Sequence, residues 1–185
     1  RLATETSRFD PATSRRTFRL RLSDLLSALL LPPLMSRIAA AAPGIRIEVS
    51  HLSPDATVDA LERNTLDLAV STSLRTPRSI ELEALFADRI VTVLRRDHPR
   101  RRSIGRLGVF VTVPQVKVAQ SPIDDRFVDR QLAALGRDRL VSLTVPHWLA
   151  VPSVVAATEL VAIMPRSIAS TFEHNGDISL AEVPV

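Results

Sequence analysis

Two adjacent polar residues, Ser23 and Asp24, stand between an alternating segment and a long apolar segment, where they could bind a small anion. In FRLRLSD, residues 18–24, every second side chain is apolar, which predicts a half-buried strand. The apolar residues that follow predict a helix. At this junction the two side chains can accept hydrogen bonds from free N–H groups of the first helical turn. Any N–H groups left over attract an anion. The pair therefore predicts a helix cap, either alone or combined with an anion site.

Small polar residues also follow the next two predicted strands, 45–49 and 66–70. Between these strands, residues 55–64 are predicted as a helix with Ser53 as its cap and Pro54 at its first position. Two strand–helix–strand crossovers in succession predict a parallel sheet covered by helices. Ligands of such sheets bind beyond the carboxyl ends of the strands. We therefore expect one polar edge made by Ser23, Asp24, His51, Ser71, Thr72 and Ser73.

The pattern starts again after a basic loop near Arg95. Apolar residues predict strands at 116–119, 140–145 and 160–164 and helices at 124–135, 148–158 and 165–172, the first of these helices closed by Gly136. A second α/β half is the simplest account of this order. The residues that follow its first two strands are Gln120 and Ser121, then Pro146, His147 and Trp148.

Most enzyme signatures are absent from the chain. Its five glycines form no dinucleotide-binding turn, no phosphate-binding loop and no G-x-S-x-G elbow. Cysteine is absent, which excludes disulfides and thiolate chemistry. The four histidines are far apart in the sequence, so no metal site is predicted. We therefore expect no cofactor and no catalysis, although His147 at the start of a helix keeps a functional role open.

The charge and hydropathy patterns give little sign of a nucleic acid or membrane partner in this chain itself. The net charge of +4 results from 23 Arg and one Lys against 20 Asp and Glu. The excess of Arg over Lys is better explained by genome composition, and the densest Arg cluster has no interleaved aromatic residues. The most apolar window, 25–34, contains Pro32 and Pro33 and is shorter than the roughly 20 residues that cross a bilayer. No secretion signal is recognisable, so the expected location is cytoplasmic.

Several segments, in this order, resemble one known family. They are FDPATSRRTFRLRLSD, LPPLMSRIAAAAPGIRIEV, LDLAV, LFADRIVTVLRRDHP and VDRQLAALGRDRLVSLTVPHWLAVPSVVAATELVAIMP. Together they are similar to the effector-binding region of LysR-type transcriptional regulators, in particular the nodulation and aromatic-acid-responsive group. The resemblance covers nearly the whole chain.

The resemblance implies an α/β fold of two Rossmann-like subdomains, of the periplasmic-binding-protein type II kind, with an effector cleft between them. It implies that 1–16 is the end of a linker, 17–94 subdomain I, 95–178 subdomain II and 179–185 the start of a crossover back to subdomain I. In the family a winged helix-turn-helix domain precedes this region and contacts DNA. The chain would thus sense an effector and form a homodimer or homotetramer.

Carried across residue by residue, the resemblance places the effector against the eleven residues already named at the strand ends. A small carboxylate is the expected ligand, because helix starts and backbone N–H groups face such a site. Relatives in the aromatic-acid group often have a histidine at the position of Gln115, so the exact ligand stays open. Binding would shift the balance between an open and a closed form.

Two other classes of protein remain as alternatives. One is a free-standing bilobal solute-binding protein, which would carry a secretion signal or lipid anchor. The other is a small α/β enzyme that uses His147 with Asp24 or Asp125. These alternatives differ from a regulator in a measurable way, because only the enzyme would show turnover.

Overall fold

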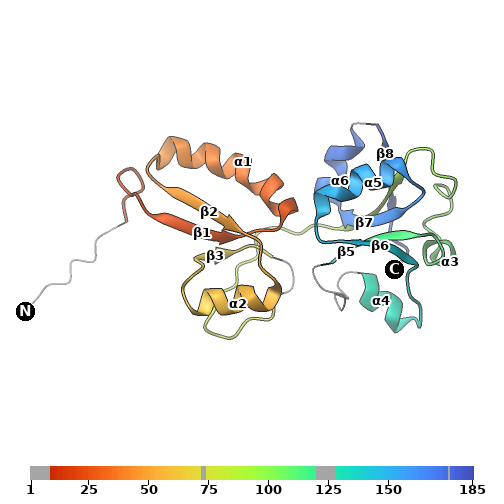
Figure 1. The fold of residues 1–185 in the computed structure, drawn as a ribbon, viewed down its shortest axis with the longest axis horizontal. Coiled ribbons are helices and arrows are strands. Elements are labelled where there is room, and N and C mark those ends of the chain that lie inside the picture. The colour runs from red at the N-terminus through yellow and green to blue at the C-terminus, as the bar shows by residue number, and fades with distance from the viewer. Residues whose placement is uncertain (1–8, 72–73, 120–127, 175) are drawn as a thin grey trace, which may run out of the picture. The chain divides into compact units, whose positions relative to one another are not determined.

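The chain folds into two compact units, residues 1–82 and residues 83–185. The computed structural model describes residues 9–71, 74–119, 128–174 and 176–185. Figure 1 shows the elements of each unit. Thr72, Ser73, Gln120 and Ser121, which the sequence places at strand ends, lie outside the described residues.

Unit 1 is a small parallel sheet with two helices. Its elements are β1 (Thr17–Arg21), α1 (Asp24–Ala41), β2 (Arg46–Ser50), α2 (Pro54–Glu62) and β3 (Leu68–Ala69). The strand order is β2-β1-β3, and both β2 and β3 pair with β1 in parallel. The chain moves one way across the sheet from β1 to β2 and back the other way to β3. Since such crossovers are right-handed, α1 and α2 lie on opposite faces of the sheet, as Figure 1 shows.

Both helix starts in unit 1 form as predicted. The Ser23 hydroxyl accepts a hydrogen bond from the Leu26 N–H at 3.2 Å. The Ser53 hydroxyl accepts one from the Ala56 N–H at 3.3 Å, and Pro54 is the first helical residue. The third strand is shorter than expected. β3 has two residues and Leu68 is 52% exposed, so a strand forms within 66–70 as predicted, but it is not buried over that length.

Helix α1 is apolar, but few of its side chains are fully buried. Its 18 residues have a mean hydropathy of 1.3, only Leu25 is buried, and Pro32 and Pro33 lie inside the helix. By length and composition alone this helix could cross a membrane. At 1.5 Å per residue it is about 27 Å long, slightly less than the roughly 30 Å of a bilayer core. The absence of a membrane partner stays a prediction.

Unit 2 is a mixed sheet with helices. Its elements are β4 (Ile90–Arg95), α3 (Leu107–Phe110), β5 (Gln115–Val118), α4 (Val128–Ala134), β6 (Val141–Val145), the 3₁₀ helix η1 (Trp148–Ala150), α5 (Val151–Ala157), β7 (Val161–Pro165), α6 (Arg166–Glu173) and β8 (Ile178–Glu182). The strand order is β6-β5-β7-β4-β8. β5 is parallel to β6 and β7, whereas β4 is antiparallel to β7 and β8. The core of the unit includes Leu94, Ile104, Phe110, Val128, Leu132 and Val161.

The strands β4 and β8 place the unit boundary earlier than the resemblance implied. β4 pairs with β7 on one side and with β8 on the other, so residues 83–94 and 179–185 fold with unit 2. The sequence analysis gave these segments to subdomain I and to a returning crossover. The pairing of two strands far apart in the chain produces no local sequence pattern, so the sequence could not show that these segments fold with unit 2.

Candidate functional site

In unit 1 the carboxyl ends of the three strands are joined by backbone hydrogen bonds. The Leu22 N–H donates to the Ser50 carbonyl at 3.1 Å, one residue beyond the end of β1. The Val70 N–H donates to the Arg21 carbonyl at 3.0 Å, one residue beyond the end of β3. The residues that follow these bonds therefore start from one edge of the sheet, as the sequence analysis expects. We call this edge, made by Ser23, Asp24, His51 and Ser71, the unit 1 edge.

The unit 1 edge combines a helix start with side chains of different exposure. Ser23 and Asp24 are half-buried and belong to the first turn of α1, while His51 is exposed and Ser71 is half-buried. The hydroxyl of Ser23 accepts a bond from the helix backbone, so its role as a cap is confirmed. Its role in binding a ligand stays a prediction. An 18-residue helix whose start opens on this edge favours a negatively charged ligand there.

One buried cation at the unit 1 edge escaped the sequence analysis. Arg21 is only 3% exposed, and its guanidinium donates to the Leu52 carbonyl from Nε at 3.1 Å and from Nη2 at 2.9 Å. A longer bond of 3.4 Å joins Nη1 to the Val70 carbonyl. The alternation of the strand had predicted a half-buried strand with Arg19 and Arg21 on its other face, and it gave no reason to single out Arg21. The guanidinium instead links the loop after β2 to the end of β3.

In unit 2 the carboxyl ends of β5 and β6 also lie side by side. The Ala119 N–H donates to the Val145 carbonyl at 3.0 Å. Pro146 and His147 follow β6 directly and are exposed, and Trp148 is half-buried at the start of η1. The segment 146–148 therefore starts beside the end of β5, but Gln120 and Ser121 cannot be placed against it, because they lie outside the described residues.

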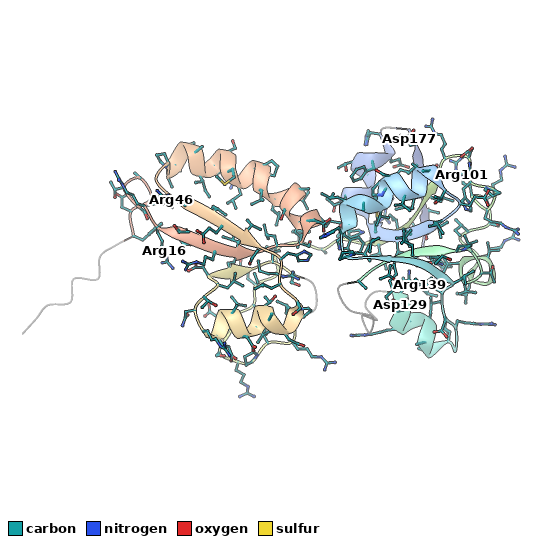
Figure 2. The ribbon with its side chains drawn as sticks, in the orientation of Figure 1. Arg16, Arg46, Arg101, Asp129, Arg139 and Asp177 are labelled. Carbon is teal, nitrogen blue, oxygen red and sulfur yellow. The ribbon has the colours of Figure 1, made fainter. Side chains whose placement is uncertain are left out.

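A buried polar network supports the sheet of unit 2. The Arg139 guanidinium, 2% exposed, binds both oxygens of Asp129 at 2.7 and 3.0 Å, and Figure 2 shows the two side chains together. Its Nη1 also donates to Gln115 Oε1 at 3.2 Å, and Gln115 Nε2 donates to the Phe110 carbonyl at 2.6 Å. Lys117 Nζ lies 3.2 Å from Asp129. Gln115 is fully buried, and both ends of its side-chain amide are hydrogen-bonded inside unit 2.

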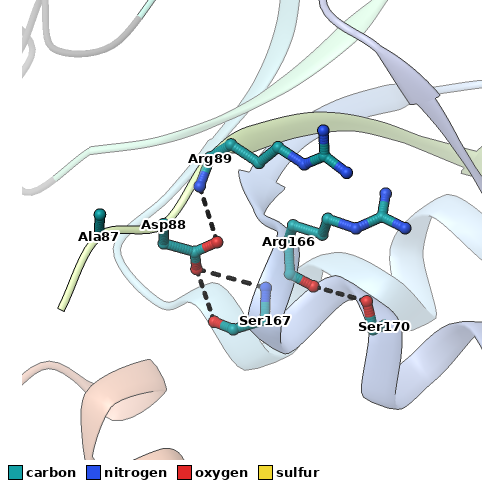
Figure 3. A pocket seen from close by; sticks show the side chains of 6 residues that line it. All are labelled: Ala87, Asp88, Arg89, Arg166, Ser167 and Ser170. Carbon is teal, nitrogen blue, oxygen red and sulfur yellow. Dashed lines mark hydrogen bonds between the residues drawn. The ribbon is translucent and has the colours of Figure 1, made fainter.

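Unit 2 also has a cavity of about 550 Å³ beside the start of α6 (Figure 3). Arg89 and Arg166 contribute two cationic side chains to its lining. Asp88 already occupies the helix start, because its Oδ2 accepts bonds from the Ser167 N–H at 3.3 Å and from the Ser167 hydroxyl at 2.6 Å. The carboxylate thus stabilises the positive end of α6. Its negative charge offsets one of the two cationic charges in the lining of the cavity.

Hydrogen bonds favour the ionised form of Asp67 in unit 1. The Arg19 backbone N–H donates to Asp67 Oδ2 at 2.8 Å, and Arg16 Nη2 binds Oδ1 at 2.8 Å. These bonds favour the ionised carboxylate and hold the pKa of Asp67 below its ordinary value of 3.8. Within the described ranges no group of three His, Cys, Asp or Glu residues could hold a metal ion.

Comparison with known proteins decides the family. A family model described as the LysR substrate binding domain matches residues 11–185. The chain belongs to this family. Among its relatives, the HTH-type transcriptional activator NagR of Ralstonia sp is 32% identical over 163 residues, which cover 87% of this chain and 54% of NagR. The chain spans about half the length of the curated relatives it matches.

Solved structures agree with this family. A probable transcriptional regulator from Pseudomonas aeruginosa is 32% identical with a TM-score of 0.85, over 96% of this chain and 59% of the other. The effector binding domain of QuiR in complex with shikimate has a TM-score of 0.73 at 16% identity, over 90% of this chain and 80% of the QuiR chain. At that identity the likeness shows the fold alone.

These comparisons confirm the two central predictions from the sequence. The fold is the α/β, periplasmic-binding-protein type II-like fold of LysR effector-binding domains. The function is that of an effector-binding domain of a LysR-type regulator, which is favoured over a free-standing solute-binding protein and over a small α/β enzyme. The relatives are transcriptional regulators.

Proposed function

We propose that this LysR substrate-binding domain senses a small carboxylate, and that the unit 1 edge supplies the first contacts to it. The observation that carries the proposal is the pair of backbone bonds that joins the three strand ends. These bonds bring a helix start, a histidine and a serine to one edge. The ligand's negative charge would be stabilised by the positive end of α1, and the hydroxyl and imidazole groups would fix its orientation.

The resemblance to the family adds residues of unit 2 to the proposed contacts. Pro146, His147 and Trp148 follow β6, and Gln120 and Ser121 follow β5 in the sequence. Thr72 and Ser73 extend the set in unit 1. A relative with the same fold was solved with shikimate, which is itself a small carboxylate and supports this ligand class.

The proposed partners follow from the family. NagR and NahR are named HTH-type transcriptional activators and are longer than this chain, so we propose that a DNA-binding domain precedes it in a longer regulator. We further propose a homodimer or homotetramer, a cytoplasmic location, no cofactor and no catalytic activity. Helix α1 is apolar and Leu25 is its only fully buried residue, which supports self-association, because apolar surface left uncovered marks interaction sites. Effector binding would act on such an assembly with a coupling of about 1–3 kcal/mol.

Ligand binding can be measured with the single tryptophan. Trp148 is half-buried within the proposed contact set, so a bound ligand should change its fluorescence. We would titrate the protein with benzoate, shikimate and an aliphatic series of carboxylates, with benzamide as the neutral control for benzoate. We expect a saturable response to at least one acid, no response to benzamide, and a weaker response in Ser23→Ala and His147→Ala.

Three outcomes would contradict the proposal. A folded sample that responds to no carboxylate by fluorescence or calorimetry would reject the ligand class. An equal response to benzoate and benzamide would show that the negative charge is not recognised. Product formation from any bound acid, lost in His147→Gln, would instead favour the enzyme alternative.

A further inference from the structure

The guanidinium of Arg21 is the most deeply buried charged group at the unit 1 edge among the described residues. It is 3% exposed, and removing a cation from water is unfavourable unless its N–H groups are satisfied. Its acceptors include the carbonyls of Leu52 and Val70. These carbonyls belong to two loops that are 18 positions apart in the sequence and carry His51 and Ser71. The buried guanidinium of Arg21 therefore lies between the two loops and is bonded to both.

The geometry of the three bonds shows what the side chain does there. Nε and Nη2 form a fork on one carbonyl oxygen, that of Leu52, at 3.1 and 2.9 Å. Nη1 reaches the Val70 carbonyl at 3.4 Å. The planar, rigid fork of arginine can hold two acceptors at a fixed separation, which the single ammonium of lysine cannot do. The backbone of the same residue accepts the bond from Val70 N–H at 3.0 Å, so Arg21 contacts the β3 end twice.

We propose that Arg21 is a positioning residue that fixes the loop after β2 to the end of β3 and thereby sets where His51 and Ser71 lie relative to Ser23. Arg21 acts through these residues and is not itself a proposed contact of the ligand. The inference rests on the proposed function for its effect on ligand affinity. Its effect on the two loops is independent of any ligand.

The test uses three variants of the full chain. Arg21→Met removes the charge and all side-chain donors at similar length. Arg21→Lys keeps the charge and one donor group but not the fork. Arg19→Met is the matched control, because Arg19 lies in the same strand, its side chain is 55% exposed and its ion pair with Glu48 is long at 3.4 Å.

Two readouts separate positioning from general stability. Amide hydrogen exchange of residues 51–53 and 70–71 should become at least tenfold faster in Arg21→Met, while exchange at Leu20 within β1 stays within twofold. The benzoate dissociation constant, measured by calorimetry, should rise at least tenfold. Arg21→Lys should fall between wild type and Arg21→Met in both readouts, and Arg19→Met should match wild type.

Other results would overturn the inference. Loop exchange within twofold of wild type in Arg21→Met would show that the guanidinium does not hold the loops. Equal acceleration throughout unit 1 would show a general loss of stability, and faster loops with an unchanged benzoate constant would remove the link to the ligand. If Arg21→Met does not fold, Arg21→Lys decides by the same criteria. If wild type binds no benzoate, the proposed ligand class fails, while loop exchange still decides the positioning role.

Discussion

The network around Asp129 in unit 2 allows a ranked prediction of stability. Arg139 and Lys117 are two cations that share the single Asp129 carboxylate, at 2.7 and 3.2 Å. Arg139→Met leaves Asp129 paired with Lys117 but removes the donor to Gln115 Oε1. Asp129→Asn leaves the two cations facing an amide, and the buried guanidinium then has no counter-charge in the network. Lys117→Met leaves the two-bond contact between Arg139 and Asp129 intact.

The magnitudes follow from burial. Breaking a buried ion pair by removing one partner costs about 3–5 kcal/mol. The Arg139 side chain is 2% exposed, whereas the side chains of Asp129 and Lys117 are 19% and 18% exposed. Because Lys117 still compensates Asp129, we expect Arg139→Met to lower the free energy of unfolding by about 3 kcal/mol. Asp129→Asn should cost more than this, and Lys117→Met should cost about 1 kcal/mol.

Urea denaturation followed by Trp148 fluorescence measures this effect, because the single tryptophan reports on unit 2. Arg137→Met is the matched control. Arg137 is exposed and lies two residues from Arg139, so its replacement should stay within about 0.5 kcal/mol of wild type. A loss below 1 kcal/mol in Arg139→Met, or a smaller loss in Asp129→Asn than in Lys117→Met, would refute the reasoning.

Three further predictions concern unit 1. Ser23→Ala and Ser53→Ala each remove a helix cap and should each lower the free energy of unfolding by about 1 kcal/mol in chemical denaturation, but only Ser23→Ala should weaken benzoate binding in calorimetry. Gly44→Ala should lower the midpoint of thermal unfolding measured by circular dichroism, because a Cβ there would lie 2.5 Å from a backbone carbonyl oxygen, whereas Gly105→Ala of unit 2 meets nothing within 4 Å and should not. The pKa of Asp67 lies below 3.8, so its carboxylate stabilises the fold above that pH and loses this effect as the pH falls through the lower folded-state pKa. The difference in unfolding free energy between wild type and Asp67→Asn, measured in urea at several pH values, should therefore shrink below pH 3.8, and a difference that grows there would contradict the assignment.

Local features of the fold could be predicted because their causes are local. The cap at Ser53 followed by Pro54 defines the start of α2 through one turn of backbone. Gly136, with a φ of 65°, follows the end of α4 as expected of a residue that closes a helix. By contrast, the antiparallel pairing of β4 with β8 joins Arg95 to Ile178. Such pairing depends on packing over the whole unit, so no window of sequence contains it.

Part of the candidate site could also be predicted from the sequence. A parallel sheet places the carboxyl ends of its strands at one edge, so the positions of Ser23, His51 and Ser71 follow from the strand order alone. The side chains of Gln115 and Arg139 could not be placed in this way. Arg139 bonds to Gln115 in β5 and to Asp129 in α4. Only the tertiary structure brings these three residues together.

Arg21 shows most clearly why an alternating pattern can mislead. Alternation assigns one face of a strand to the core and the other to solvent, which holds for a strand whose sheet is covered on one side. β1 is the central strand of its sheet, and the two crossovers place a helix on each face. Both sets of side chains on β1 therefore point toward covered faces. At the middle of the strand Arg19 still reaches solvent, but at its carboxyl end Arg21 is enclosed by the loop at Leu52 and the end of β3. In a strand covered on both faces, a charged residue at the carboxyl end is thus a candidate for positioning the loops of a site. Its position in the sheet indicates this role better than its place in the alternating pattern.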